Sequence, residues 1–473
     1  MRVNKMAKNS IQGLCAAEAE SIFKQKLGKN FDVNVLKFKT QKSEALLVFI
    51  AGLVSKDLID RDIITPLKDK TFKGKPEDTI NAAFEQEDDI DKLVMKVVDG
   101  SVIFFYSGAQ KALIIDFKEY ETRSISVPDS ESVVRGPKES FTENLATNIT
   151  LVRRKLKNPS LAVKKITVGK ETNTVVTVLY LESAVNKKVL KNVLTKLKKI
   201  DAKSIFGSGE IEQLIEDHPL SMLPSTGLTQ KPDTLAAKLA EGHVGILCDG
   251  SPHALVIPEV FAETFSTAED YYSRVPISNF LRILRVISFV ISIFFPGFMA
   301  AIISFHQGMI PFVFLKTFIA ATQDTPLPES VEILMLIIMF ELIKEGGTRL
   351  PKTAGAAITI VGSLIIGDAA VNAGFISAPS VIIVSIAAVA SLLLSNLNEF
   401  ITLLRIVVLI AGATFGLMGI SCATILIVAL ICGKESFGVE IMTNFANRKR
   451  KNSIFRLPMD KLKDTLQKLR KSA

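Results

Sequence analysis

The chain has 473 residues, 48% of them hydrophobic, with a mean hydropathy of +0.33 and no tryptophan, which is enough for two or three domains. The formal net charge is +9, and the segment 434–473 carries +7 of it, with 11 Lys and Arg against 4 Asp and Glu. Because this basic tail follows an apolar segment, it indicates the cytoplasmic side of a membrane and anionic lipid headgroups, and argues against nucleic-acid binding.

The sequence contains no hydrolase, kinase, zinc-protease or dinucleotide-binding motif. Its four histidines lack the spacing of metal ligands, and its four cysteines form no CxxC pair. We therefore expect no enzymatic activity, no cofactor and no metal site.

Residues 1–275 read as a soluble α+β region of two similar lobes, at 1–125 and 161–275. At one constant offset along the chain, Gly100 and Gly108 recur as Gly242 and Gly250. Each lobe has a β-branched strand (45–50 and 175–181) that leads into an amphipathic helix, and then a hairpin whose turn glycine can take positive φ. We interpret the repeat as a duplication; the alternative is chance similarity between generic strand–helix–hairpin units.

Residues 126–160 are expected to form a linker and a connecting helix. The segment 124–138 is charged and punctuated by Pro and Gly, whereas 139–158 has helical spacing of apolar residues.

Residues 283–433 read as an all-α polytopic membrane domain, because they contain three long uncharged stretches, at 286–305, 369–398 and 406–433. We expect spans near 286–305, 331–345, 355–374, 380–397 and 401–433. Residues 310–323 are too short to cross and suit an interfacial or re-entrant helix. The last stretch is long for one span, and its glycines Gly412, Gly416 and Gly419 favour two.

Charge placement favours six spans over five. With the N-terminal region in the cytoplasm, Arg349, Lys352 and Arg405 follow an even number of spans, and the basic tail (434–473) returns to the cytoplasm only if the total is even.

The helical part contains polar residues that are costly in a membrane. Glu341, Glu345 and Arg349 are spaced i, i+4, i+8 on one helix face, and Lys344 can neutralise Glu341. One interpretation is a helix end that reaches cytoplasmic water through internal ion pairs. The other is an ion-pathway or gating collar.

Asp368 strengthens the second interpretation, because it lies between apolar residues with Asn372 at i+4 on the same face. The candidate pore or gating residues are therefore Glu341, Glu345, Arg349, Asp368 and Asn372. Gly346, Gly347 and Pro351 are expected to turn the chain towards the Asp368 helix, and with Lys344 they are the candidate signal-coupling residues.

Several longer segments of the chain form recognisable motifs. They are AEDYYSR (268–274), FPGFMAAIISFHQGMIP (295–311), PLPESVEILMLIIMFELIKEGGTRLP (326–351), IVGSLIIGDAAVNAGFISAPSVIIV (360–384), GPKESFTENLATNITLVRRKL (136–156), SGEIEQLIED (208–217) and KPDTLAAKLAEGHVGILCDGSPHALVIP (231–258). These segments resemble the A subunits of GerA-type spore germination receptors. The chain departs from the family pattern at Gln230-Lys231, where an acidic–arginine pair is common. It also departs at VEIMTNF (439–445), in place of a proline-containing exit.

The resemblance implies a subunit of a nutrient receptor in the inner membrane of endospores, with its N-terminal region and tail on the core side. It implies transporter-like, germinant-binding B-type partners, lipoprotein C-type partners, and a homo-oligomer of A subunits that conducts ions. A non-conducting scaffold or signal relay is the rival expectation. A secondary transporter is a third, although no convincing inverted repeat is present.

Overall fold

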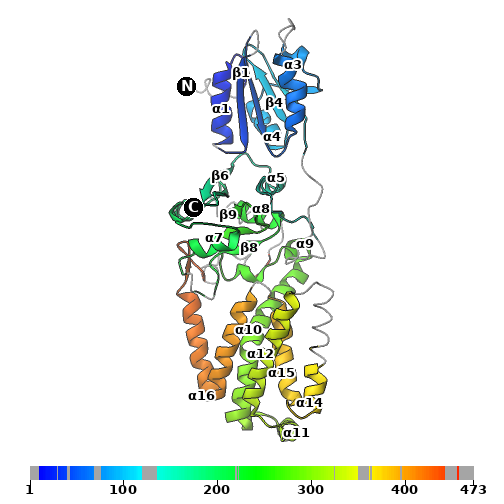
Figure 1. Cartoon of the computed structure of the whole chain (residues 1–473), viewed down its shortest axis with the longest axis vertical. Helices are drawn as coiled ribbons and strands as arrows, with labels where there is room; N and C mark the ends of the chain where they lie inside the picture. Colours follow the sequence, from blue (N-terminus) through cyan, green and yellow to red (C-terminus); the bar gives the residue numbers. More distant parts are fainter. Residues whose placement is uncertain are drawn as a thin grey trace.

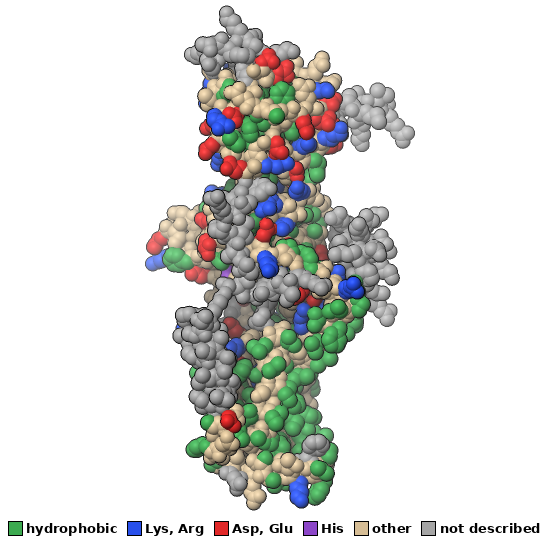
Figure 2. Space-filling model, turned by 90° about the vertical axis from the view of Figure 1, so that its right-hand side faces the viewer, with side chains coloured by type: hydrophobic (Ala, Val, Ile, Leu, Met, Phe, Trp, Pro, Cys, Tyr) green, Lys and Arg blue, Asp and Glu red, His purple; other side chains and the backbone are tan. Residues whose placement is uncertain are grey.

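The computed structural model describes residues 10–28, 30–39, 43–68, 76–119, 136–218, 221, 223–323, 325–349, 362, 365–394, 397–442 and 455–456. Along the long axis of the molecule, two α/β layers are followed by a group of helices (Figure 1). Charged side chains cover the first two layers, whereas hydrophobic side chains dominate the surface of the helical part (Figure 2).

The first layer is a five-stranded antiparallel sheet of order β1-β2-β4-β5-β3. Its central strands are buried along nearly their whole length because helices cover both faces. The elements are α1 (Ala16–Leu27), β1 (Val33–Lys39), β2 (Glu44–Ile50), α2 (Lys56–Ile59), η2 (Asp60–Ile64), α3 (Thr65–Lys68), η3 (Pro76–Thr79), β3 (Phe84–Glu87), α4 (Ile90–Val98), β4 (Val102–Tyr106) and β5 (Ala112–Ile115).

The second layer repeats this strand order, as β6-β7-β9-β10-β8, again fully antiparallel. Its hairpin strands β9 and β10 follow their counterparts β4 and β5 at one and the same offset along the chain. The elements are α5 (Leu145–Lys155), β6 (Leu161–Val168), β7 (Thr174–Leu181), α6 (Lys187–Lys199), α7 (Ser208–Ile215), β8 (Gly227–Thr229), α8 (Pro232–Glu241), β9 (Val244–Cys248) and β10 (Ala254–Ile257).

The hairpin glycines behave as the sequence predicts. Gly108 and Gly250, in the turns after β4 and β9, have φ of 95° and 81°. Gly100 and Gly242, which precede the same strands, have φ of 95° and 104°. A side chain would be strained at all four positions, so the shared glycines reflect shared backbone geometry.

Helix α5 joins the two layers. The predicted connecting helix is present, but it is shorter than 139–158 and packs into the core of the second layer, with Leu145, Ile149 and Val152 buried. Its Arg153 side chain is buried and binds Asp32 of the first layer through two hydrogen bonds of 2.5 and 2.8 Å. Breaking a buried ion pair of this kind costs about 3–5 kcal/mol, so it fixes the two layers to each other.

The helical part begins with two short helical turns, η4 and α9, and ends at Cys432. Its elements are η4 (Glu263–Phe265), α9 (Glu269–Tyr272), α10 (Val275–Phe305), η5 (Gln307–Met309), α11 (Phe312–Thr322), α12 (Glu329–Thr348), η6 (Ile365–Ala369), α14 (Ala370–Asn372), α15 (Ala378–Leu392) and α16 (Asn398–Cys432). Among the described residues, α10 and α16 are the helices that are long and apolar enough to cross a membrane, judged by length and composition alone. Most of the expected 355–374 span lies outside the described residues.

Helix α16 is not one straight rod. Gly416 has φ 61° and ψ −146°, which interrupts the helix and leaves two arms, 398–415 and 417–432. A Cβ on Gly419 would lie 2.1 Å from the Ala411 carbonyl oxygen, and one on Gly412 would lie 2.4 Å from the Gly297 carbonyl oxygen of α10. The stretch therefore folds back on itself, with small residues allowing close helix contact, as its glycines predict.

The chain then returns to the second layer. The expected tail begins with a small hairpin of β11 (Glu435–Ser436) and β12 (Val439–Glu440). Between these strands, Phe437 is 1% exposed and belongs to the hydrophobic core of the second layer, where Asn192 donates to its carbonyl oxygen at 3.1 Å. Ser436 donates its hydroxyl to the Ser225 carbonyl oxygen at 2.6 Å. The basic cluster 448–451 lies outside the described residues.

Candidate functional site: polar residues of the helical part

Glu341 lies on the side of α12 that faces α16. Its Oε2 accepts a hydrogen bond from Lys344 Nζ at 2.8 Å, and its Oε1 accepts one from Thr402 Oγ1 of α16, also at 2.8 Å. All three side chains are half-buried. The predicted Glu341–Lys344 pair is confirmed, and Thr402 is a partner that the sequence analysis did not identify.

Glu345 and Arg349 form a separate pair on the surface. Arg349 donates to Glu345 Oε1 from Nε at 2.8 Å and from Nη2 at 2.5 Å, and both side chains are more than half exposed. An exposed i, i+4 pair of this kind stabilises a helix by about 0.3–0.5 kcal/mol. The three predicted collar residues therefore occupy two different environments.

The glycine pair does not turn the chain. Gly346 and Gly347 lie within α12, which continues to Thr348, so the expectation that these two glycines turn the chain is wrong. Glycine in the last turn of a helix costs about 1 kcal/mol, which the rest of a long helix can offset. Pro351 lies outside the described residues.

Asp368 and Asn372 share a face, as predicted. Asp368 lies in the π-helical turn η6, Asn372 lies in α14, and the Asn372 amide donates to Asp368 Oδ1 at 3.0 Å. Both side chains are exposed in the single chain. The expectation that Asp368 is buried is therefore wrong for the isolated subunit.

The two polar groups are not bonded to each other in the part of the chain that the structure describes. Glu341 is bonded to Lys344 and Thr402, whereas Asp368 is bonded to Asn372. Ser377, five residues after Asn372, contacts Glu332, which lies nine residues before Glu341 on α12.

Arg405 is buried among the helices. Its side chain is 0% exposed, with Nε donating to the Ser292 carbonyl oxygen at 2.7 Å and Nη2 donating to the Ala387 carbonyl oxygen at 3.4 Å. These contacts tie α16 to α10 and α15. The sequence analysis missed this role because charge counting places a residue on one side of the membrane without saying which helices surround it.

Two further residues at the start of α12 were missed. Glu332 is 0% exposed, and Glu329 lies one turn before it. A glutamate pair at i, i+3, directly before the apolar run 333–340, is the sequence signal that marks them.

A buried ionic network holds the start of α10. Asp270 of α9 is 1% exposed and accepts hydrogen bonds from Arg282 Nε at 2.9 Å and from Arg285 Nη1 and Nη2 at 2.9 and 3.0 Å. Burial alone raises the pKa of Asp270, but the hydrogen bonds from Arg285 and Arg282 outweigh it and hold that pKa below its usual value. Arg456 of the tail donates to the Asp270 and Tyr271 carbonyl oxygens at 2.6 and 3.1 Å. The junction between the lobes and the helices is therefore held by one buried carboxylate that binds two arginines, with a third arginine bound to backbone carbonyl oxygens beside it.

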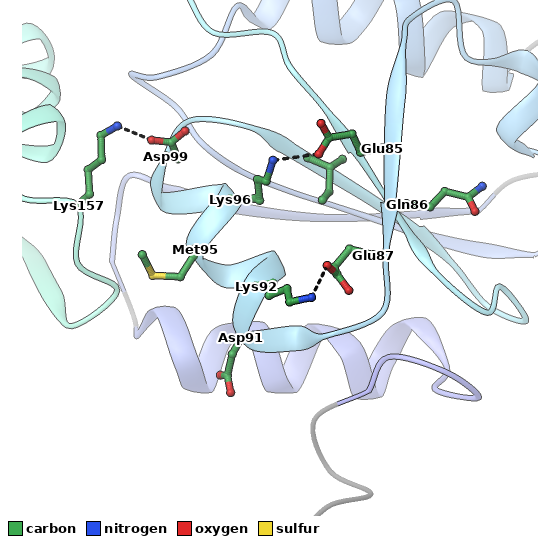
Figure 3. Close-up of a pocket in the computed structure, with 10 residues that line it drawn as sticks. Glu85, Gln86, Glu87, Asp91, Lys92, Met95, Lys96, Asp99 and Lys157 are labelled. Carbon is green, nitrogen blue, oxygen red and sulfur yellow. Dashed lines mark hydrogen bonds and ion pairs between the residues drawn. The ribbon is translucent and has the colours of Figure 1, made fainter.

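The first layer carries a surface pocket of about 580 Å³, formed by β3, α4 and Lys157 (Figure 3). Its lysines are already engaged: Lys92 binds Glu87 at 3.0 Å, Lys96 binds Glu85 at 2.9 Å, and Lys157 binds Asp99. Its lining residues include no histidine, cysteine or serine.

The comparisons with known proteins agree with one another. The family described as Bacillus/Clostridium GerA spore germination protein matches residues 21–467. "Spore germination protein KA" of Bacillus subtilis (strain 168) is 37% identical over 451 residues, which are 92% of this chain and 83% of that protein. "Spore germination protein GerLA" of Bacillus cereus is 34% identical over 431 residues, covering 88% of each chain.

Among solved structures, the chain is similar to the N-terminal domain of the A subunit of the Bacillus megaterium spore germinant receptor GerK3. The identity is 28%, the match covers 53% of this chain and 97% of that one, and the TM-score is 0.42.

Proposed function

The chain belongs to the GerA family of spore germination proteins, and we propose that it is the A subunit of a nutrient germinant receptor in the spore inner membrane. In this proposal several copies assemble into a nutrient-gated cation channel. Its partners are a transporter-like, germinant-binding B-type subunit and a C-type lipoprotein, and it has no enzymatic activity of its own.

The exposure of Asp368 is the observation that carries the channel proposal. A carboxylate exposed on an apolar helical part cannot rest against lipid without a large penalty. In a membrane it must face water or protein, and a lumen between several copies supplies both. Oligomers with rings of acidic side chains are a common way to conduct cations.

The position of Glu341 suggests how the channel is gated. Its carboxylate connects α12 to α16 through Thr402, a contact between two helices of the same chain. A germinant that binds the partner subunit and favours a shifted α12 would break this contact and open a constriction.

The membrane topology that we propose has six passes. The hairpin after α16 packs into the second layer, and α10 starts from that layer, so both ends of the helical part lie on one side. An even number of passes follows, with α10, α12, the segment around 355–374, α15 and the two arms of α16. The N-terminal lobes and the tail then face the spore core.

We also propose that the two lobes arose by duplication, consistent with their common strand order, their matched offsets and their positive-φ glycines. Stacked lobes of the same fold provide a tall surface on which neighbouring subunits make contact. The domain boundaries follow as 1–125, 126–160, 161–275, 283–433 and 434–473.

Spores that carry Asp368→Asn or Glu341→Gln provide the test. Each change removes one negative charge and preserves shape, and we expect potassium release after nutrient exposure to slow at least several-fold. Glu345→Gln is the matched control, because it removes an exposed pair on the same helix and should leave release unchanged. Normal release from both test variants, with receptor levels equal to wild type, contradicts the assignment.

A non-conducting scaffold is the second candidate, and the Lys344–Glu341 contact favours it. A carboxylate neutralised at 2.8 Å by its own helix needs no ion pathway to explain it. Ion flux into liposomes that contain the purified chain alone separates the two functions, because a scaffold gives no flux above empty liposomes.

A further inference from the structure

Glu332 is a buried carboxylate that completes the start of another helix. Its Oε2 accepts hydrogen bonds from the Ser377 backbone N–H at 3.0 Å, from the Ser377 hydroxyl at 2.7 Å and from the Ser380 hydroxyl at 2.9 Å. Ser377 is the N-cap of α15, so this oxygen replaces the missing partners of the first turn. All three hydrogen bonds go to Oε2, and none of them goes to Oε1.

The second oxygen of Glu332 has no hydrogen-bond partner, although the whole side chain is buried. Glu329, one turn earlier on the same helix face, also has a buried Oε1 without a partner, and the two carboxylates interact electrostatically. Among the described residues, no Lys, Arg or His nitrogen lies within 4.0 Å of either carboxylate. The hydroxyl of Thr325 faces Glu332 from the preceding turn.

The charges in this cluster do not balance. If both carboxylates were ionised, they would contribute two negative charges, against about half a positive charge from the N-terminus of α15. Buried charge of this size is relieved either by a proton held on the carboxylates or by a bound cation. The atoms offered are carboxylate and hydroxyl oxygens, which are the ligands that hard cations prefer.

We propose that Glu329 and Glu332, together with the hydroxyl groups of Ser377 and Ser380, form a binding site for a hard metal cation at the end of the helical part far from the lobes. The cation lies between the two unpartnered Oε1 atoms and links α12 to the start of α15. The cation thereby holds the N-terminal end of α12, the same helix that carries Glu341. Binding of the cation does not require the chain to conduct ions.

Thermal unfolding of the purified full-length chain in detergent tests the site. Sodium, potassium and calcium chlorides are each compared with N-methyl-D-glucamine chloride at the same ionic strength, because that organic cation is too large for the site. We expect at least one of the metal cations to raise the midpoint by a few degrees, in a saturable manner. Glu332→Gln and Glu329→Gln should abolish the increase, whereas Glu399→Gln, a carboxylate change at the start of α16, should preserve it.

Ser380→Ala provides a variant that keeps both charges and removes one oxygen ligand. We expect it to weaken cation affinity about tenfold, measured by equilibrium dialysis with radioactive sodium or calcium, while leaving the far-UV circular dichroism spectrum unchanged. An equal midpoint in all four salts overturns the proposal. So does a midpoint that depends on pH but not on the cation, since the two carboxylates then share a proton. Both measurements are made without a membrane, so they are independent of the channel proposal.

Discussion

At the scale of single residues, a buried group of charges joins the second lobe to the segment that leads into α10. Lys238 of α8 binds Glu263 of η4 at 2.5 Å, and His243 Nε2 lies 3.3 Å from the same carboxylate oxygen. Burial opposes ionisation of Glu263, but the charges of Lys238 and His243 outweigh it and hold its pKa well below the usual value. Among the described residues, no Lys, Arg or His nitrogen lies within 4.0 Å of the Glu259 carboxylate. Burial and the charge of Glu263 raise the pKa of Glu259 to about 7, against the opposing effect of Lys238.

The raised pKa of Glu259 predicts a pH dependence of stability. Between pH 4.5 and about 7 the unfolded chain ionises Glu259 while the folded chain keeps the proton, so the stabilisation present at low pH is lost as pH rises. The loss of folding free energy on passing through this pH range is roughly 3 kcal/mol. We expect Glu259→Gln, which stays neutral, to gain stability relative to wild type between pH 5 and pH 8 in thermal unfolding of the full chain. A constant difference between the two proteins over this range contradicts the prediction.

At the scale of elements, the helices of the C-terminal part are joined by polar contacts in an apolar setting. Arg405 connects α16 to α10 and α15, Thr402 connects α16 to α12, and Glu332 connects α12 to α15. Each contact satisfies a group that is expensive to bury alone. The helices therefore have a defined register, which uniform apolar packing does not specify by itself.

The turn between the two arms of α16 depends on Gly416. Its φ and ψ lie in a region essentially reserved for glycine, and a Cβ would stand 3.0 Å from His306 Cε1. We expect Gly416→Ala to cost about 1–3 kcal/mol from backbone strain alone, lowering the unfolding midpoint. Gly308→Ala is the control, since no atom lies within 4 Å of its Cβ and its φ is not positive. If Gly416→Ala and Gly308→Ala have equal unfolding midpoints, the turn does not depend on Gly416.

At the scale of the whole molecule, the segment that follows the last helix packs into the core of the second lobe. Phe437 occupies the same hydrophobic core as Val193 and Ile246, and Lys196 Nζ lies 4.4 Å from the centre of its ring. A shift of the last helix is therefore transmitted directly to the lobe, and a shift of the lobe to the helix. This connection is a physical route between the second lobe and the helical part.

The six-pass topology proposed above predicts that the second lobe and the end of α10 lie on opposite sides of the membrane. Phe206 on the second lobe and Met309 after α10 are 70% and 59% exposed. Each is replaced by cysteine in a chain that lacks the four native cysteines. In cells that express the chain, we expect a membrane-impermeant maleimide to label Met309→Cys in intact cells, and to label Phe206→Cys only after the cells are lysed. Labelling of both positions from the same side rules out the six-pass topology.

The sequence alone determined the features that depend on local geometry. The turn glycines, the hairpins, the fold in 401–433 and the pairs Glu341–Lys344 and Asp368–Asn372 all follow from residues close together in the chain, where conformation and i, i+3 or i, i+4 spacing decide the outcome. The tertiary structure decided the rest. Four features depend on partners far away in the chain. They are the burial of Arg405, the hydrogen bonds from the start of α15 to Glu332, the end of α12 beyond Gly346, and the position of Phe437 in the second lobe. Only packing brings those partners together, because a buried charge or ring is stable solely where distant segments supply its hydrogen bonds and contacts.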